Sequence, residues 1–290
     1  MSRELAALVA LVALLVAAWV GYGIVFAEGG ESVVVATLSG DVRVSGAPAA
    51  AGAPVRASDR VVSGAGGRAV LEVRDGRGEG TARISVDPST SIRLLQVDAS
   101  GARLELEGGR VRATVRPGGD RVGVVAAGRE VSVADADAVV ARDGDVVGVE
   151  ALKGAVELLG VAGVERLAEG ERVTVSGEGL LRAPVTDALL LYVAPTRERT
   201  REDHAEVQGR CAPGAVVRVR RAGAAVDAGA GGWVETRADT TGAFVAVVPL
   251  IEGDNTLVIE ARDVFGAVAV SEARVVRDTT APSGGVIIRY

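Results

Sequence analysis

Apolar and polar residues alternate along much of the chain after residue 30, and this alternation predicts β-strands. One face of each such strand would lie on a core and the other in water; the clearest runs are RAVLEVR at 68–74, LELE at 104–107, VRATVR at 111–116 and RVTVS at 172–176. Glycine, aspartate and proline supply turn signals between the runs, at residues 39–41, 75–76, 108–109, 117–119 and 143–145. We therefore expect residues 31–178 to form a domain of about ten or more short strands.

A second alternating region follows a short linker at residues 179–187 and extends over residues 188–280, before a tail at 281–290. Seven short strands are predicted there, at residues 189–193, 205–209, 216–220, 233–237, 244–249, 256–261 and 267–276. Short strands separated by turns over about 90 residues are typical of a β-sandwich. The predicted fold class is therefore all-β.

The first 30 residues contain an uncharged apolar run at residues 5–27. A helix of this length rises about 34 Å, enough to cross a bilayer. Trp19 and Tyr22 lie near its far end, and Arg3 precedes it, which favours a cytoplasmic N-terminus. The prediction is a single-pass inner-membrane anchor with the bulk of the chain in the periplasm. The alternative is a signal peptide cleaved after Ala27, which would give a secreted protein.

Composition restricts the chemistry. The net charge of −6 argues against a nucleic-acid partner. Residues 31–178 contain no Phe, Tyr, Trp, Met, Cys or His, so this region has no thiol or imidazole for catalysis or metal binding and no aromatic platform for stacking. Cys211 is the single cysteine, which leaves a buried thiol or an intermolecular bridge. His204 is interpreted as a solvated loop residue.

Motifs that suggest ligands have simpler explanations here. GAGGRA at residues 64–69 fits a loose dinucleotide pattern, but a strand pattern follows it, so we expect a hairpin turn. The aspartates that hint at calcium lack the EF-hand spacing: Asp135, Asp137, Asp143 and Asp145. We predict no enzyme activity, no catalytic, cofactor-binding or metal-ligating residue, and no cofactor.

Several segments of the first region resemble FecR-type domains. They follow the family's order: GDVRV at 40–44, DRVVSG at 59–64, RAVLEVRDG at 68–76, STSIRL at 89–94, LELEGGRV at 104–111, KGAV at 153–156 and LAEGE at 167–171. The family's Gly-Thr-x-Phe segment is replaced here by VADADAV at 133–139. The resemblance implies a solenoid-like periplasmic β-domain, which in its best-known members relays a signal from an outer-membrane receptor to a cytoplasmic sigma factor. The four residues before the apolar run are too few for a cytoplasmic anti-sigma module.

The second region resembles bacterial immunoglobulin-like modules, which serve as spacers or as adhesion and binding units. The similar segments lie at residues 207–209, 212–219, 241–244, 250–258, 261–266 and 278–282. Gly242 and Gly253 are expected in turns, Phe244 and Val258 in the core, and Asn255 bonded to its own backbone. Trp233 is expected to anchor the core, with an exposed ligand platform as the alternative. Arg218, Arg220 and Arg221 alternate with valines and predict a wet strand face.

Together these observations predict a non-catalytic, envelope-anchored binding or scaffold protein. Its partners would be an envelope protein, peptidoglycan or polysaccharide, with the inner membrane contacted through residues 5–27. The alternative is a component of a transmembrane signalling system that acts with a separate membrane or sigma-factor partner.

Overall fold

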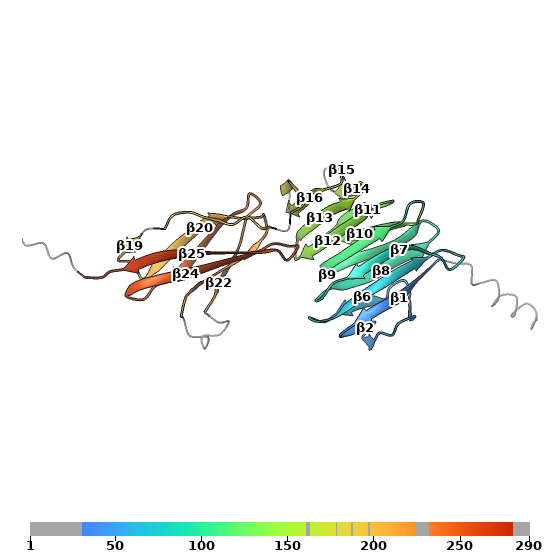
Figure 1. Ribbon diagram of the computed structural model, residues 1–290, viewed down its shortest axis with the longest axis horizontal. Helices are drawn as coiled ribbons and strands as arrows, with labels where there is room; N and C mark the ends of the chain where they lie inside the picture. The colour runs from blue at the N-terminus through green and yellow to red at the C-terminus, as the bar shows by residue number, and fades with distance from the viewer. Residues whose placement is uncertain are drawn as a thin grey trace, which may run out of the picture. The chain divides into compact units, whose positions relative to one another are not determined.

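The computed structural model describes residues 31–160, 163–177, 179–186, 188–196, 198–223 and 232–280. Every regular element in this part is a β-strand (Figure 1), which confirms the all-β prediction. None of the described residues belongs to a helix that could cross a bilayer, and the predicted anchor at residues 5–27 lies outside them. The chain forms two compact units. The first comprises described residues up to Val140 together with Ala151–Glu169, and the second comprises Ala141–Glu150 and the described residues from Gly170 onward.

The first unit places its strands in two sheets, which we call sheets A and B. Sheet A contains β1 (Ser32–Ser39), β4 (Pro54–Val55), β6 (Arg68–Arg74), β7 (Gly80–Val86) and the second half of β9 (Gly101–Val115), to which β12 (Asp137–Asp143) is also paired. Sheet B contains β2 (Val42–Val44), β3 (Ala47–Pro48), β5 (Arg60–Ser63), β8 (Ser91–Asp98), the first half of β9, β10 (Arg121–Ala126), β11 (Arg129–Val133), β14 (Val156–Gly160) and β15 (Gly163–Leu167).

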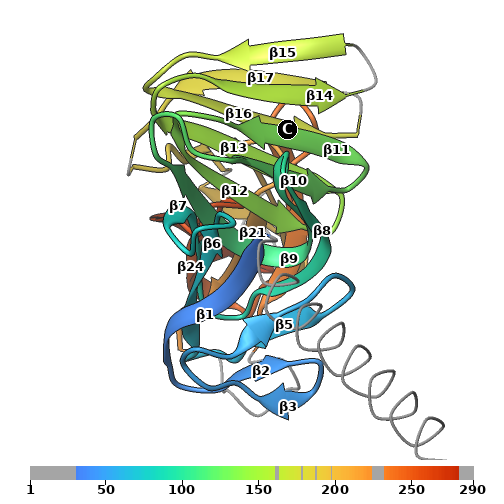
Figure 2. The same ribbon diagram turned by 90° about the vertical axis from the view of Figure 1, so that its right-hand side faces the viewer.

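The chain alternates between these two sheets in short steps. The β2–β3 hairpin lies in sheet B, the β6–β7 hairpin in sheet A, and the β10–β11 hairpin in sheet B again (Figure 2). The period-two pattern lets a strand bury one face and expose the other. In β6, for example, every second side chain is buried. The buried side chains are small or branched; those of Leu71, Ile84, Ile92, Leu104 and Leu106 are 0–1% exposed.

Strand β9 belongs to both sheets. Its first half pairs with β8 in sheet B, and its second half pairs with β7 in sheet A. The predicted turn at residues 108–109 is therefore wrong, because both glycines lie inside one long strand where it passes from one sheet to the other. Gly109 has a φ of +92°, and a Cβ atom there would lie 2.4 Å from Thr90 Oγ1. Only glycine fits this position without strain.

Two buried hydroxyl groups form hydrogen bonds beside the point where β9 passes from sheet B to sheet A. Thr90 Oγ1 accepts a hydrogen bond of 3.0 Å from the Arg110 N–H, and the Thr90 N–H donates to Ser63 Oγ at 2.9 Å. The Ser63 hydroxyl in turn donates to the Asp87 carbonyl oxygen at 2.5 Å. Ser63 and Thr90 are 3% and 1% exposed, so these bonds satisfy polar groups that water does not reach.

Most of the second unit consists of two sheets, C and D, over one hydrophobic core. Sheet C has the order β18 (Tyr192–Val193), β20 (His204–Arg210), β23 (Ala243–Pro249). Sheet D has the order β19 (Arg199–Thr200), β25 (Val268–Arg277), β24 (Gly253–Arg262), β21 (Val216–Arg221), β22 (Val234–Arg237). Each of the seven predicted strands overlaps an observed one, although the first shrinks to two residues. Strand β19 was missed because two residues carry no periodicity.

The core of the second unit shows which faces of its strands point inward. Leu257 and Ile259 are fully buried and Phe244 is 3% exposed. The prediction that Val258 points into the core is wrong, because the alternation of β24 places its two neighbours there and leaves Val258 half-buried. The Asn255 side chain bonds nearby backbone groups, as expected of a turn residue, but those of Ile251 and not its own: its Oδ1 accepts from the Ile251 N–H at 3.0 Å and its Nδ2 donates to the Ile251 oxygen at 2.8 Å.

The second unit also contains the start of β13 (Val146–Lys153), together with β16 (Glu171–Ser176) and β17 (Gly179–Pro184). β16 pairs with both of the others. Arg172 on β16 is largely buried within this unit, where it forms ion pairs with Glu150 and, at 3.5 Å, with Asp263. Its guanidinium lies 4.4 Å from the centroid of the Phe265 ring. Burial raises the pKa of Asp263, an effect opposed by a backbone hydrogen bond from Ala267 and by the charge of Arg172.

Candidate interaction surfaces

The outward face of sheet B carries a network of charged side chains around Glu107. Arg60 and Arg93 lie opposite each other on β5 and β8, and both reach this carboxylate. Arg60 Nε donates to Oε2 at 2.6 Å, Arg93 Nη2 donates to Oε1 at 2.7 Å, and Ser91 Oγ donates to Oε2 at 2.7 Å. The Glu107 side chain is 15% exposed, whereas those of the two arginines are 56% and 46% exposed.

The hydrogen bonds of this network control the ionisation of Glu107. Burial by itself raises the pKa of Glu107, but the bonds from Arg93, Ser91 and Arg60 outweigh it and lower the pKa to about 2. The carboxylate is therefore charged throughout the physiological range and compensates the two guanidinium groups beside it. A shallow hollow next to Arg60 and Arg93 also contains Ser58, Leu94 and Leu95. Because its cations are already paired, this hollow is a weak candidate for an anion site.

The same kind of pairing recurs across the first unit. Arg103 pairs with Glu130 at 2.8 Å, and Arg110 and Arg112 pair with Asp87 and Asp137. These cross-strand pairs compensate charge on both sheets.

Three of the four aspartates considered for calcium are occupied in a similar way. Asp137 pairs with Arg112, Asp135 Oδ1 accepts from the Gly118 N–H at 2.7 Å, and Asp143 pairs with Arg237 at 2.9 Å. Within the described residues no group of three or more potential ligands could hold a metal ion. GAGGRA leads from β5 into β6, which is a strand and not the helix that a dinucleotide loop requires. The predicted hairpin is wrong, because β5 pairs in sheet B and β6 in sheet A, and the turn carries the chain from one sheet to the other.

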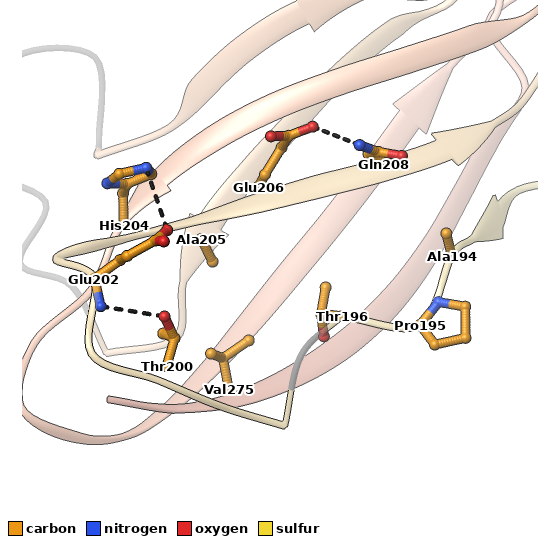
Figure 3. A pocket seen from close by; sticks show the side chains of 10 residues that line it. All are labelled: Ala194, Pro195, Thr196, Thr200, Glu202, His204, Ala205, Glu206, Gln208 and Val275. Carbon is orange, nitrogen blue, oxygen red and sulfur yellow. Dashed lines mark hydrogen bonds and ion pairs between the residues drawn. The ribbon is translucent and has the colours of Figure 1, made fainter. Parts of the chain in front are cut away.

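The second unit has a polar hollow of about 410 Å³ (Figure 3). It is lined by Ala194, Pro195, Thr196, Thr200, Glu202, His204, Ala205, Glu206, Gln208 and Val275. His204 is exposed, as predicted, although it is the first residue of β20 and not part of a loop. Its Nδ1 lies 2.9 Å from Asp203 Oδ1, and this hydrogen bond raises the pKa of His204 and lowers that of Asp203. The hollow is acidic and presents one imidazole, with no cysteine or serine among its lining residues.

Three other predicted residues of the second unit can now be placed. Trp233 is half-buried and lies outside the hydrophobic core, with the Arg220 guanidinium 4.7 Å from its ring centroid. The prediction of a core anchor is therefore wrong. Cys211 packs against the core, and burial raises the pKa of its thiol to about 11. Arg218 is exposed between the buried Val217 and Val219, as expected for a wet strand face.

Two strands of the second unit carry exposed apolar side chains. Val245 and Val247 on β23 are 50% and 53% exposed, and Val268 and Val270 on β25 are 46% and 62% exposed. Sequence reasoning did not identify these positions. The available signal was the run AFVAVVP at residues 243–249, which contains no charged residue.

Comparison with known families identifies part of the chain. Residues 59–157 match the FecR protein family. The chain contains a FecR domain. The match begins just before β5 and ends within β14, so the FecR domain includes β9, the Ser63–Thr90 contacts and the Glu107 network. Several of the motifs noted in the sequence lie within residues 59–157. Two of them have a visible structural role: one forms the turn at residues 64–67, and the other supplies the glycines at which β9 passes between the two sheets.

Solved structures add more distant likenesses. Two crystal structures of a protein from Parabacteroides distasonis, described as an anti-sigma factor, share 18% and 17% sequence identity with this chain at a TM-score of 0.37. The match covers 43% of this chain and 59% of that protein, so it spans less than two thirds of its length. A structure from a study of a bacterial ice-binding adhesin is 14% identical over 85% of each chain, at a TM-score of 0.23. No curated protein matches the chain.

Proposed function

We propose that this protein is a non-catalytic component of a regulatory system of the cell envelope and acts through protein–protein contacts. The observation that carries the proposal is the FecR domain at residues 59–157. FecR-type domains are periplasmic modules of signalling systems, and the resemblance noted in the sequence extends beyond this stretch on both sides. A role as an envelope scaffold remains the second candidate, favoured by the exposed apolar strands of the second unit.

The proposed arrangement has three parts. Residues 5–27 would anchor the chain in the inner membrane, followed by a solenoid-like FecR domain and an immunoglobulin-like sandwich in the periplasm. The alternation of hairpins between sheets A and B supports the solenoid-like description. Two sheets over one core support the sandwich. The apolar length of residues 5–27 supports the anchor.

The reactive groups of the described residues support a non-catalytic role. The thiol of Cys211 has a pKa raised to about 11 by burial, so it is protonated and a weak nucleophile at neutral pH. His204 is exposed and bonded to Asp203, with no nucleophile among the residues that line its hollow. Neither group forms the nucleophile–base pair that covalent catalysis requires.

A protein partner fits these surfaces better than a glycan. Sugar binding commonly uses several exposed aromatic rings, but the sequence from 31 to 178 contains none. In the second unit the Arg220 guanidinium lies over Trp233, and Tyr192 is an exposed ring at 61%. Exposed valines on β-strands are instead typical of surfaces that pair with another chain.

In-cell photo-crosslinking of the full chain tests the proposal. One set of variants carries the crosslinker at an exposed position of the FecR domain, Arg83, and another carries it at Val270 of the second unit. Recovery of one stoichiometric membrane receptor or regulator from the Arg83 set supports the regulatory role. Sedimentation with purified cell wall, without such a partner, would contradict it and favour a wall-bound scaffold.

A further inference from the structure

Strand β23 lies at one edge of sheet C. It pairs with β20 along one side, from the His204–Pro249 pair to the Arg210–Ala243 pair. Among the described residues, no strand pairs with its other side. An unpaired edge exposes a row of backbone N–H and C=O groups that readily pair with another strand. The groups that β23 presents along this side therefore decide which strand fits it.

The backbone groups of β23 alternate between its two sides. Just beyond its ends, the Leu250 N–H donates to the Asp203 oxygen at 2.8 Å, and the Gly242 oxygen accepts from the Cys211 N–H at 2.9 Å. The N–H and C=O of one residue in an antiparallel strand point to the same side, and successive residues point to opposite sides. The even-numbered residues of β23 therefore bond β20, and the odd-numbered residues direct their groups to the unpaired side.

Two valines supply the free groups of that side. At Ala243 the N–H donates to Asp239 Oδ1 at 3.0 Å, and the C=O accepts from the Asp239 N–H at 2.8 Å. Pro249, at the other end of the strand, has no N–H to donate. Val245 and Val247 each present one N–H and one C=O, and no hydrogen bond from a described residue reaches these groups on this side.

We propose that a second copy of this chain occupies the edge, with its own β23 antiparallel to the first. A two-fold axis at Ala246 would place Val245 of each copy opposite Val247 of the other. Each of these two pairs would exchange both of its hydrogen bonds, so every free N–H and C=O of the two valines would be used. Sheet C, which has three strands in one copy, would continue into the sheet of the second copy.

The side chains of β23 also fit a second copy. A two-fold axis brings equivalent residues together, so self-pairing is favourable where like charges do not meet, and β23 contains no charged residue. The other edge strands of sheets C and D differ: β18 and β19 have two residues each, and β22 carries Glu235 and Arg237. Seven uncharged residues, rich in valine, therefore distinguish β23 from the other described edges of these two sheets.

The outward face of sheet C has the polarity that such a contact requires. Val245 and Val247 are 50% and 53% exposed next to the edge, and their partners on β20 are the polar Gln208 and Glu206. In the proposed register the valines of both copies form one apolar cluster, with the polar residues outside it, as in an interface with an apolar centre and a polar rim. The proposal concerns the second unit and does not depend on the proposed function.

Sedimentation of the full chain in detergent, over a range of protein concentrations, tests the proposal. The double variant Val245→Lys/Val247→Lys places lysine opposite lysine across the two-fold axis. The matched control, Val268→Lys/Val270→Lys, adds the same charge to β25 at side chains that are 46% and 62% exposed. Thermal unfolding of each chain reports whether the second unit remains folded.

We expect the unmodified chain and the control to dimerise as the concentration rises, and the dissociation constant of Val245→Lys/Val247→Lys to be at least about tenfold higher. Monomers of the unmodified chain at every concentration would overturn the proposal. Equal dimerisation of all three chains would also overturn it, because the contact would then lie elsewhere.

Cysteine crosslinking tests the register without added charge. A chain with Val245→Cys is mixed with a differently tagged chain with Val247→Cys, and the unmodified chain measures any disulfide through the half-buried Cys211. Opposite positions lie about 5.5 Å apart between Cα atoms, within reach of a disulfide, whereas equivalent positions are diagonal neighbours at about 7–8 Å. Disulfides between unlike chains should therefore predominate. Equal amounts between like and unlike chains would contradict the two-fold axis at Ala246.

Discussion

Several outward-facing arginines of the first unit are paired across strands with carboxylates, whereas β23 and β25 of the second unit present exposed valines to solvent. The Glu107 network and the Arg103–Glu130 pair represent the first pattern. Val247 and Val270 represent the second. On the first surface, opposite charges neutralise each other. The second surface leaves apolar area in water, and burying this apolar area against another strand is the more favourable process.

This comparison suggests a division of roles. Charged side chains on the outward faces of the first unit make non-specific pairing of its strands unfavourable. The apolar edge of the second unit is available for specific pairing. The stability of both units should then depend on buried residues and on special backbone positions, and only weakly on their outward faces.

The largest expected effect is in the core of the second unit. Leu257→Ala removes a side chain that is 0% exposed, so the free energy of unfolding should fall by about 3 kcal/mol. Val258→Ala, one residue along β24, should cost about 1 kcal/mol or less because Val258 is half-buried. Urea unfolding measures both. Equal losses would contradict the observed register of β24.

A backbone position should dominate in the first unit. Gly109→Ala places a Cβ atom 2.4 Å from Thr90 Oγ1 at a φ of +92°, and we expect a loss of about 2 kcal/mol from strain and displacement of Thr90. Gly108→Ala is the matched control, since a Cβ atom there meets nothing within 4 Å. Equal stability of the two variants in thermal unfolding would contradict the close approach of Gly109 to Thr90.

The charge network on sheet B should contribute less, and its contribution should depend on pH. Glu107→Gln removes a carboxylate whose pKa is lowered from 4.5 to about 2, and the expected loss at neutral pH is about 1 kcal/mol because both arginines are half exposed. The folded-state pKa is the lower one, so this stability is fully present above pH 4.5 and is lost as the pH falls towards 2.

Unfolding of the Glu107→Gln chain and of the unmodified chain between pH 7 and pH 2 measures this contribution. The difference between them should shrink across the acid range. The exposed Glu79→Gln variant is the control, because it removes a carboxylate that lies outside the Glu107 network. A difference that grows as the pH falls would contradict the assignment.

The smallest effect is expected on the outward face of the second unit. Val270→Lys replaces a side chain that is 62% exposed and should change the free energy of unfolding by no more than about 0.5 kcal/mol. Val275→Lys, on the same strand but 2% exposed, should be strongly destabilising. Strong destabilisation by Val270→Lys would mean that β25 is already covered in the native protein.

The sequence was most informative where local alternation decides the outcome. It predicted the strands from residue 205 onward to within three residues at each end, and it predicted that the Asn255 side chain bonds backbone, although not that its partner is Ile251. It failed where the outcome depends on non-local contacts. A glycine pair reads as a turn, so Gly108 and Gly109 did not reveal a strand shared by two sheets. Trp233 was expected in the core because tryptophan is large and apolar, but Arg220 provides a partner outside it.

Exposed surfaces were the least predictable. Alternation shows that one face of β23 is buried, but it does not show whether the other side of the strand is paired. Pairing depends on which strands become neighbours in space, and this follows from the topology of sheets C and D. The charge network around Glu107 was hidden for the same reason, since its members come from β5, β8 and β9.

The passage of β9 between sheets A and B has a mechanical consequence. Tension applied to the first unit cannot peel one sheet away while the other stays intact, because β9 is hydrogen-bonded in both. Its parallel pairing with β10, from the Gly101–Arg121 pair to the Glu105–Val125 pair, would resist sliding of the two strands through several bonds at once. A force that reaches β9 is therefore shared between the two sheets before either one yields.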